Sequence, residues 1–424
     1  MIPMNPTKPI RPAQPALAAL LLALTLAACT SGPTEPVEPV LPRALTTQEE
    51  GLITSGNLFG LSLFRAVSAA EGVQNVFLSP LSVSMALGMT LNGAEGATRT
   101  AMVQTLELAG LTEDEINAAY CSLIDLLTGL DNKVVFEIAN SIWYREGLPI
   151  DTAFVGLNES FFDAVVQELD FSSPEAVPTI NGWVDAKTHG KIEEILSGPI
   201  DPLVVMYLIN AIYFNGDWTW RFDANQTADR PFYLTGGGEV EVPAMRLEAD
   251  LPYYSDESFQ AVDLPYGDGF YSMTVLLPQS GEDLDTFITG LDAGFWSTLL
   301  NAFTETPVKL LQLPKFRLEY EIELSEVLSA LGMGIAFDAD TADFSRMITE
   351  PWDLFISRVL HKTFVEVDEE GTEAAAVTAV EVSFDTSVGP GGGIYMVVDR
   401  PFVFVLRERL SGTILFIGKY IGPD

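Results

Sequence analysis

The 424-residue sequence contains few side chains that could perform catalysis. Only two histidines are present, His189 and His361, and no Gly-x-Ser-x-Gly motif marks a nucleophilic serine. Two distant histidines also fall short of the three or four closely spaced ligands that a zinc site requires. The acidic run Asp338-Ala339-Asp340 continues to Asp343, where a calcium loop needs glycine. We therefore predict no catalytic residues, no metal site and no cofactor.

The stretch from Val365 to Ser387 indicates chemistry of another kind, because it could change its secondary structure. It reads VEVDEEGTEAAAVTAVEVSFDTS and is followed by a glycine-rich run. Glu-Ala-Ala-Ala has high helix propensity, whereas Val377, Thr378, Val380 and Val382 favour strands. Taken alone, the stretch fits an ordinary alanine-rich helix with a loop after it. It also fits a segment that is loop or helix in one state and strand in another.

Apolar periodicity predicts the elements that would carry this stretch. Helices are expected over residues 52–70, 79–91, 97–108, 154–169 and 322–331. Strands are expected over 134–144 and 204–214, in hairpins between 233 and 278, over 309–320 with a break at Pro314, and in a closing hairpin of 396–406 with 413–420. Because helices come first and strands dominate the end, the predicted fold class is α+β.

Residues within this stretch resemble the hinge of the reactive-centre loop of serpins, the serine-protease-inhibitor family. The hinge residues are Glu369, Glu370, Gly371, Thr372, Glu373, Ala374, Ala375 and Ala376. Further blocks similar to the family are Asn75–Ser82 with Asn92-Gly93-Ala94, Ile180–Trp183 with Gly190-Lys191-Ile192, Asn210–Trp218, Asp399–Phe404 and Gly412–Gly418. The resemblance covers nearly the whole chain. It implies the serpin fold of three β-sheets and about nine helices with an exposed reactive-centre loop, here about residues 369–395.

The resemblance implies irreversible, suicide-substrate inhibition of serine endopeptidases, and also of some cysteine endopeptidases. A target protease would cut the exposed loop and form an acyl-enzyme, and the cut loop would then enter the main sheet and trap the protease. The chemistry is the protease's own. The alternatives are a non-inhibitory serpin that acts as a binding protein or plain protease substrate, and an envelope hydrolase or solute-binding lipoprotein, for which the catalytic residues are missing.

Insertion into a sheet makes a demand on alternate residues, because successive side chains of a strand face opposite sides. From Thr372, the first set reads Thr372, Ala374, Ala376, Thr378, Val380 and Val382, without a charge. The second set carries Glu373 and Glu381. The uncharged set could enter a core, so we interpret the hinge as that of an inhibitory serpin.

The bond to be cut follows less directly from the sequence. The usual family offset from Glu369 predicts Asp385 as P1 and Thr386 as P1′. However, Glu369 and Pro401 are 32 residues apart, which is longer than in typical members. Phe384 is therefore an alternative P1 residue, and it would suit chymotrypsin- or subtilisin-like enzymes.

Other side chains correspond to serpin residues around the main sheet. By resemblance, His361 would meet Asn210 and Ser82 at the shutter, beneath the centre of the sheet. Trp218 would lie at the top, where the loop begins to insert, and Lys315 would be the partner of Glu369. The simpler interpretations are a satisfied core histidine and a surface ion pair of little energetic value. We expect His189 to be exposed and assign it no role.

The first residues are typical of a targeting signal. Lys8 and Arg11 precede an uncharged run over residues 16–28, and Leu26-Ala27-Ala28-Cys29 resembles a bacterial lipobox. We therefore expect a lipoprotein signal peptide over residues 1–28 and a lipid anchor at Cys29, in the outer membrane or at the cell surface, with the domain in the periplasm or extracellular space. The alternative is a plain secretory signal.

A proline-rich tether is predicted over residues 29–47, followed by one domain over 48–424. Pro33, Pro36, Pro39 and Pro42 recur every third residue, as in polyproline II. At about 3.1 Å per residue, residues 30–47 would span about 55 Å. The only other cysteine, Cys121, lies in an apolar pattern and is expected in the core, so no internal disulfide is predicted. We expect a monomer.

The formal charge of −37 restricts the partners further. Basic clusters for phosphate binding are missing, so we predict no nucleic-acid partner. The acidic, lysine-poor composition also disfavours direct adhesion to anionic lipid headgroups. The expected partners are a target serine protease, held covalently, and a membrane contacted through Cys29.

Overall fold

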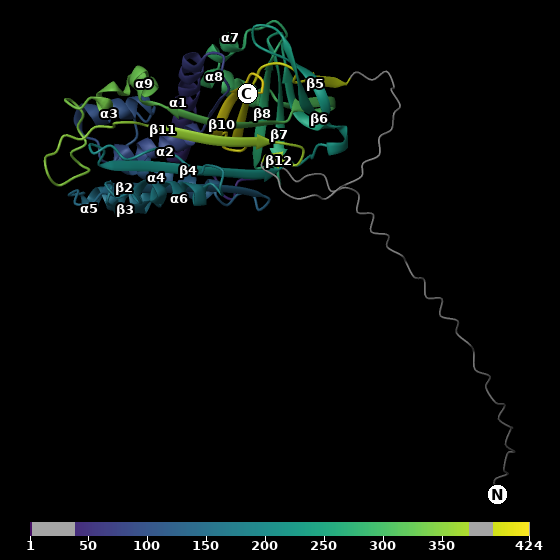
Figure 1. The fold of residues 1–424 in the computed structure, drawn as a ribbon. Helices are drawn as coiled ribbons and strands as arrows, with labels where there is room; N and C mark the ends of the chain where they lie inside the picture. The colour runs from purple at the N-terminus through teal and green to yellow at the C-terminus, as the bar shows by residue number, and fades with distance from the viewer. Residues whose placement is uncertain (2–38, 373–392, 424) are drawn as a thin grey trace. The chain divides into compact units, whose positions relative to one another are not determined.

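The computed structural model describes residue 1 and residues 39–372 and 393–423 (Figure 1). Residues 38–424 cluster as one compact unit. This unit includes residues 39–46, which we had assigned to the tether: Leu45 packs against the core, and Arg43 donates two hydrogen bonds to the buried carboxylate of Glu49. The described domain thus begins about nine residues before the expected boundary. Within the described ranges, no helix is long and apolar enough to cross a membrane.

The described ranges contain nine α-helices. They are α1 (Thr47–Glu71), α2 (Pro80–Leu91), α3 (Gly96–Thr105), α4 (Glu113–Leu127), α5 (Thr152–Phe162), α6 (Ala176–Lys187), α7 (Leu284–Thr289), α8 (Ala293–Ala302) and α9 (Ser325–Leu328). Local sequence explains where several begin. Thr46 with Glu49 forms a capping box at α1, and Thr112 with Glu115 forms another at α4. Ser79 caps α2 ahead of Pro80.

Fifteen strands lie in the same ranges. They are β1 (Val76–Leu78), β2 (Val134–Arg145), β3 (Val165–Leu169), β4 (Met206–Asp217), β5 (Ala228–Tyr233), β6 (Glu239–Ser255), β7 (Phe259–Tyr266), β8 (Tyr271–Pro278), β9 (Thr304–Pro314), β10 (Phe316–Glu323), β11 (Leu360–Val367), β12 (Gly371–Thr372), β13 (Ile394–Val397), β14 (Phe402–Glu408) and β15 (Ile414–Tyr420).

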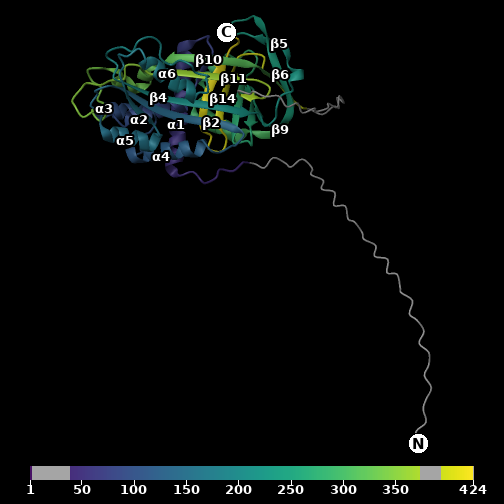
Figure 2. The same ribbon diagram turned by 60° about the horizontal axis from the view of Figure 1, so that its bottom comes forward.

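These strands form two hydrogen-bonded sheets. The six-stranded sheet has the order β10-β11-β12-β4-β2-β3, part of which can be followed in Figure 2. The nine-stranded sheet has the order β1-β15-β14-β8-β7-β6-β9-β13, with β5 on β6. The expected third sheet is continuous with the second, because the long strand β6 pairs with β5 and β9 over most of its length and with β7 at its end.

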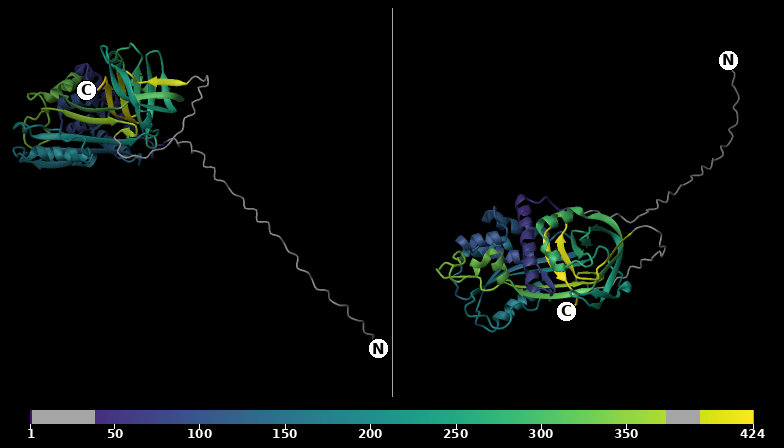
Figure 3. Two further views of the ribbon diagram at one scale, coloured as in Figure 1. Left: turned by 45° about the vertical axis from the view of Figure 1, so that its right-hand side comes forward. Right: turned by 90° about the horizontal axis from the view of Figure 1, so that it is seen from above.

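Helices cover both faces of the six-stranded sheet. On one face, α6 packs on β2 and β4 through Trp143, Ile180, Val184 and Ile209. On the other face, α2 contacts both β4 and β15 and so joins the two sheets. Figure 3 shows the purple helix α1 beside the yellow strands β14 and β15, with which it shares the main core. This core is large and mostly aliphatic and aromatic.

Four sequence predictions differ from the structure. The helix expected over 154–169 ends at Phe162, because Asp163 adopts a left-handed conformation and Val165–Leu169 forms β3. The helix expected over 322–331 begins only at Ser325, since β10 continues to Glu323, and after Leu328 it becomes a π turn over Ser329–Met333 in which Gly332 has a φ of 117°. Residue 396 belongs to β13, which pairs with β9 rather than with the closing hairpin of β14 and β15. Cys121 is only half-buried.

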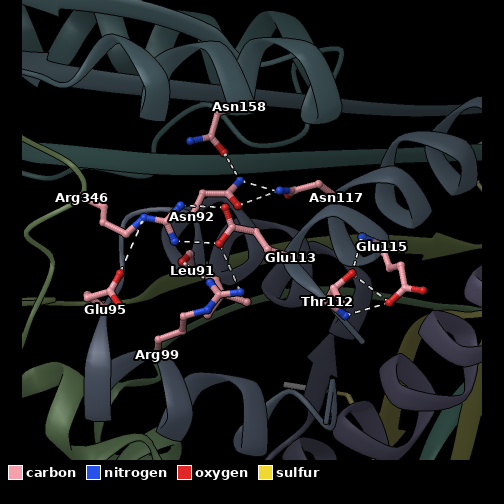
Figure 4. Close-up of polar contacts among 10 residues, drawn as sticks. All are labelled: Leu91, Asn92, Glu95, Arg99, Thr112, Glu113, Glu115, Asn117, Asn158 and Arg346. Atoms are coloured by element: carbon pink, nitrogen blue, oxygen red, sulfur yellow. Dashed lines mark hydrogen bonds and ion pairs between the residues drawn. The ribbon is translucent and has the colours of Figure 1, made fainter. Parts of the chain in front are cut away.

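A polar network joins α3 and α4 to the segment that follows α9 (Figure 4). The Arg346 guanidinium donates two hydrogen bonds of 2.7 Å to the carboxylate of Glu113, and Arg99 lies 3.4 Å from the same carboxylate. Beside it, the buried amides of Asn92, Asn117 and Asn158 bond to one another. The hydrogen bonds from Arg346 lower the pKa of Glu113 despite partial burial. The network therefore fixes Arg346 and its neighbours Phe344 and Met347, and these two neighbours line a cavity of about 790 Å³.

We predict that Glu113→Gln lowers the free energy of unfolding by about 1–2 kcal/mol at neutral pH, since a bidentate, partly buried pair with arginine is lost. Because the folded pKa of Glu113 is lowered, its contribution is present above the ordinary pKa of 4.5 and is lost as the pH falls below it. Urea unfolding between pH 3 and pH 7 measures this. Asp114→Asn is the control, because it removes a neighbouring charge from the same helix end without breaking the pair. Equal effects of the two substitutions at pH 7 would contradict the prediction.

Candidate functional site

The candidate site is the gap between strands β4 and β11 of the six-stranded sheet. Of the residues that the structure describes, the two of β12 lie between these strands at one end: Gly371 pairs with Asp217, and Thr372 pairs with both Gly216 and Val367. Among the described residues, β4 and β11 do not pair with each other directly. Two residues of the hinge, Gly371 and Thr372, thus already form a strand in the gap.

Gly371 is required by this close fit. A Cβ atom at residue 371 would lie 2.1 Å from the backbone oxygen of Gly216 and 2.8 Å from the Cα of Asp217. These are backbone atoms, so they cannot move aside as a flexible side chain would. Thr372 is buried, and its hydroxyl shares a 2.6 Å hydrogen bond with the Tyr266 hydroxyl. Gly371 therefore lies where no side chain would fit, and the hydrogen bond of Thr372 to Tyr266 fixes the next residue.

Trp218 holds the turn between β11 and β12. Its indole nitrogen donates to the carbonyl of Asp368 at 2.9 Å, and its backbone nitrogen donates to the carbonyl of Glu370 at 2.8 Å. Its ring stacks on Tyr266, with 4.3 Å between the ring centroids. The backbone nitrogen of Phe222 donates to the carbonyl of Glu369. Trp218 thus lies against the residues at the start of the hinge.

Glu369 is held from two sides. Lys315 donates to one carboxylate oxygen at 2.6 Å, and the Thr227 hydroxyl donates to the other at 2.7 Å. Burial raises the pKa of Glu369, but the hydrogen bonds from Lys315 and Thr227 outweigh it, and the pKa lies below its ordinary value. Because the Glu369 side chain is only 11% exposed, this pair is better shielded from water than the simple surface ion pair that we considered.

Beyond β12 the gap continues as a cavity of about 790 Å³. Its walls come from β4 over residues 206–212, from β11 over residues 360–364, and from the connection over residues 352–359. Most of the lining side chains are apolar, and Ser79, Ser82, Asn210 and His361 lie at its inner side. A long, mostly apolar slot between two strands is suited to an extended peptide with small or apolar side chains on one face.

The predicted shutter residues lie together, but their hydrogen bonds differ from expectation. His361 accepts a 3.0 Å bond at Nε2 from the backbone nitrogen of Ser79, rather than bonding to Asn210 or Ser82. The Ser82 hydroxyl donates to the backbone oxygen of Asn210 at 3.3 Å. The Asn210 amide donates to Asn140 at 2.8 Å, while the buried side-chain oxygen of Asn210 has no partner among the described residues.

Burial lowers the pKa of His361 to about 4. The ring is therefore neutral at pH 7, and because Nε2 accepts a bond, the proton is on Nδ1. A charged imidazolium could not accept from Ser79. The cluster beneath the centre of the sheet is thus uncharged, which suits a place where strands must separate and close again without stranding a buried charge.

Several residues of the site were not found from the sequence. Ser79, Thr227, Tyr266 and Asn140 make the contacts above, yet only Ser79 had a signal, as the helix cap before Pro80. His189 is exposed, as expected, and its ring lies 2.9 Å from Glu137. No group of three or more His, Cys, Asp or Glu side chains in the described ranges could hold a metal ion. The predicted residues Cys29, Glu373, Ala374, Ala375, Ala376, Phe384, Asp385 and Thr386 lie outside the described residues.

Comparison with known proteins identifies the family. A family model described as Serpin (serine protease inhibitor) matches residues 54–423. Serpin B9 of Homo sapiens is 35% identical over 382 residues, covering 88% of this chain and 100% of its own. The leukocyte elastase inhibitor of Sus scrofa is 35% identical over 384 residues, with the same coverage. The chain therefore belongs to the serpin family, which is described as a family of serine protease inhibitors.

Solved structures agree with this assignment. The native state of Tengpin, a thermophilic serpin, is similar with a TM-score of 0.80 and 31% identity, covering 92% of this chain and 97% of that one. A complex of thyroxine-binding globulin with thyroxine has a TM-score of 0.79 and 26% identity, covering 88% and 99%. The chain has the serpin fold, as its sequence predicted.

We predict that Gly371→Ala expels β12 from the sheet, because the added methyl group would overlap the backbone of Gly216. Hydrogen exchange should then become faster at the amides of residues 371–372 and at the Trp218 amide, which donates to Glu370. Gly56→Ala is the matched control, since Gly56 lies in α1 with no atom near its added Cβ and should gain about 0.5–1 kcal/mol. Unchanged exchange at residues 371–372 in Gly371→Ala would rule out the packing described here.

We predict that His361 makes stability depend on pH between 6.5 and about 4. The unfolded histidine takes up a proton as the pH falls below 6.5, whereas the folded one does so only near pH 4, so stability is lost over this range by on the order of 3 kcal/mol. Denaturant midpoints of the wild type and His361→Gln at pH 7 and pH 4.5 measure the effect, which should be smaller in the variant. His189→Gln, at an exposed histidine, should keep the wild-type dependence.

Proposed function

We propose that this serpin is an irreversible suicide-substrate inhibitor of serine endopeptidases, with cysteine endopeptidases as a second class of target. The observation that supports this most directly is the slot between β4 and β11, whose upper end is already occupied by the hinge residues Gly371 and Thr372. A cut loop that continued from Thr372 would extend an existing strand. It would not have to nucleate a new one.

The proposed step has simple chemistry. The Oγ atom of the protease's serine attacks the carbonyl of the P1 residue, the amide bond breaks, and the P1′ nitrogen leaves as an amine with the transferred proton. The P1 carbonyl is then joined to the protease as an ester. Insertion of the cut loop into the slot competes with attack of water on this ester. The serpin needs no catalytic residue of its own for this sequence.

The register of β12 supports the choice of inserted residues. Thr372 lies opposite Gly216 of β4 and Val367 of β11. In an antiparallel strand continued without a bulge, Thr378 would lie opposite Asn210 and His361. The core-facing set would then be the uncharged one, from Ala374 to Val382, while Glu373 and Glu381 would face the side of α6. The Thr378 hydroxyl could bond to the unpartnered side-chain oxygen of Asn210.

The depth of the slot bears on the bond that is cut. In the same register, Val382 would lie opposite Met206, the first residue of β4. Full insertion therefore uses the chain up to about residue 382, and the cut must fall after it. Both Asp385, with Thr386 as P1′, and Phe384 meet this condition as P1. The similarity to Serpin B9 and to the leukocyte elastase inhibitor also supports an inhibitory function.

A non-inhibitory function is the second candidate. Thyroxine-binding globulin, which is similar over most of the chain, was solved with thyroxine bound, so the same fold can serve a binding protein. Under this alternative a protease would cut the loop and leave. The uncharged core-facing set of the hinge favours the inhibitory function.

We also propose that residues 1–28 are a lipoprotein signal peptide and that Cys29 carries a lipid anchor in a bacterial outer membrane or at the cell surface. The support is the charged start, the apolar run and the sequence Leu26-Ala27-Ala28-Cys29. Cleavage before Cys29 would remove Lys8 and Arg11 and change the formal charge from −37 to −39. The inhibitor would then protect the envelope that carries it.

The test of inhibition mixes the domain from residue 38 onward with subtilisin, chymotrypsin and elastase. We expect a complex that survives denaturing electrophoresis, together with a released peptide whose mass defines P1. Complete cleavage in the loop with no such complex, for every protease of a broad panel, would contradict inhibition and favour the non-inhibitory function.

We predict that Thr378→Arg converts the inhibitor into a substrate, because a charged side chain would meet the buried cluster of Asn210 and His361 during insertion. The amount of inhibitor consumed per protease molecule trapped should rise steeply. Glu373→Arg is the matched control, because it puts the same charge into the other set at a position that is already charged and that would lie opposite Asn215 and Glu366, and it should leave this stoichiometry near the wild-type value. If both variants trap protease equally well, the register continued from β12 is wrong, even if inhibition itself holds.

A further inference from the structure

The chain enters the domain at the end of the six-stranded sheet where the reactive-centre loop begins. The Pro39 ring lies 3.6 Å from the position of a Cβ atom on Gly269, in the turn between β7 and β8. In the same turn, Gly267 donates from its nitrogen to the carbonyl of Asp217, the residue opposite Gly371. One four-residue turn therefore contacts both the first described residues of the N-terminal segment and the strand that holds the hinge.

The segment from Pro39 to Thr46 is fastened to the domain along its length. Arg43 donates to Glu49 at 2.8 and 2.5 Å and to the Ser122 hydroxyl of α4 at 2.8 Å. The hydrogen bonds from Arg43 lower the pKa of Glu49 to about 2 in spite of burial, so the pair stays charged over the physiological range. Because these residues are fixed, they cannot extend the reach of the tether.

This fixation shortens the tether that the sequence alone predicted. The following step rests on the proposed lipid anchor at Cys29. Ten residues separate Cys29 from Pro39. At about 3.1 Å per residue in polyproline II, these ten residues reach about 31 Å. The sequence alone predicts a tether that ends at residue 47 and reaches about 55 Å.

We propose that the end of the domain that presents the reactive-centre loop is kept within about 31 Å of the membrane that holds Cys29. The protease that it traps is then one that works at the surface of that same membrane. Lys133, Arg221 and Lys315 at this end are each paired with a carboxylate. The partner of this end is a membrane-associated endopeptidase.

A spectroscopic experiment tests the orientation without relying on inhibition. The full, lipidated chain carries Cys121→Ser and one labelling site. The site is either Trp220→Cys, next to the hinge, or Asp340→Cys, in the segment after α9. Helix α9 lies far from β12 in Figure 1. Each protein is reconstituted in phosphatidylethanolamine and phosphatidylglycerol vesicles that carry a headgroup acceptor dye. We expect more energy transfer from residue 220 than from residue 340. Equal transfer, or more from residue 340, would overturn the proposal.

A kinetic experiment tests the choice of partner. Complex formation is timed with subtilisin free in solution and with subtilisin attached to the same vesicles. We expect the vesicle-bound chain to react faster with attached than with free subtilisin, and a Gly-Ser insertion after residue 33 to reduce this preference. Detergent should abolish it. An equal rate with both forms on vesicles would count against the proposal.

The outcomes separate this proposal from those that it rests on. The Cys29→Ala variant should not stay with the vesicles. If the wild-type chain does not stay with them either, the anchor and the proposal are both refuted. If the chain forms no covalent complex with subtilisin even in detergent, inhibition is refuted. The energy-transfer result would still decide the orientation.

Discussion

The functional features of this serpin depend on two strands of one sheet that are held apart. Strands β4 and β11 flank a slot that only Gly371 and Thr372 enter among the described residues. Exposed strand edges are a liability in most proteins, because they accept other strands. Here the liability is confined: α2 closes one face of the slot, α6 lies over the neighbouring strands on the other, and the turn at Asp368 closes the upper end.

The two ends of the slot are built differently, and the difference follows from solvent access. The upper end uses charge, with the mostly buried Glu369 between Thr227 and Lys315, and the Lys315 side chain is still 35% exposed, so this partner can return to water when the pair separates. The middle uses neutral groups, with an uncharged His361 and the amides of Asn140 and Asn210. A buried ion pair in the middle would resist the separation of strands that insertion requires.

The sequence was sufficient for the fold and for the position of the hinge, and insufficient for particular contacts. Apolar periodicity and turn residues identified α2, β2 and the hairpins between β5 and β8. Asp163 could not be recognised as a left-handed helix end, since aspartate also occurs within helices. The bond from Ser79 to His361 joins residues 282 positions apart, so no local pattern could reveal it. No local pattern could reveal the contact of Pro39 with Gly269 either, and this contact places Pro39 in the domain rather than in the tether.

The slot also determines how much work one molecule can do. A strand that has entered between β4 and β11 would gain hydrogen bonds on both edges and side-chain burial on one face, and nothing in the described fold offers a way to withdraw it. Each molecule would therefore act once. Under the proposed function, the capacity of the inhibitor would equal the number of intact molecules, would be replenished only by synthesis, and would end when the last intact copy had been consumed.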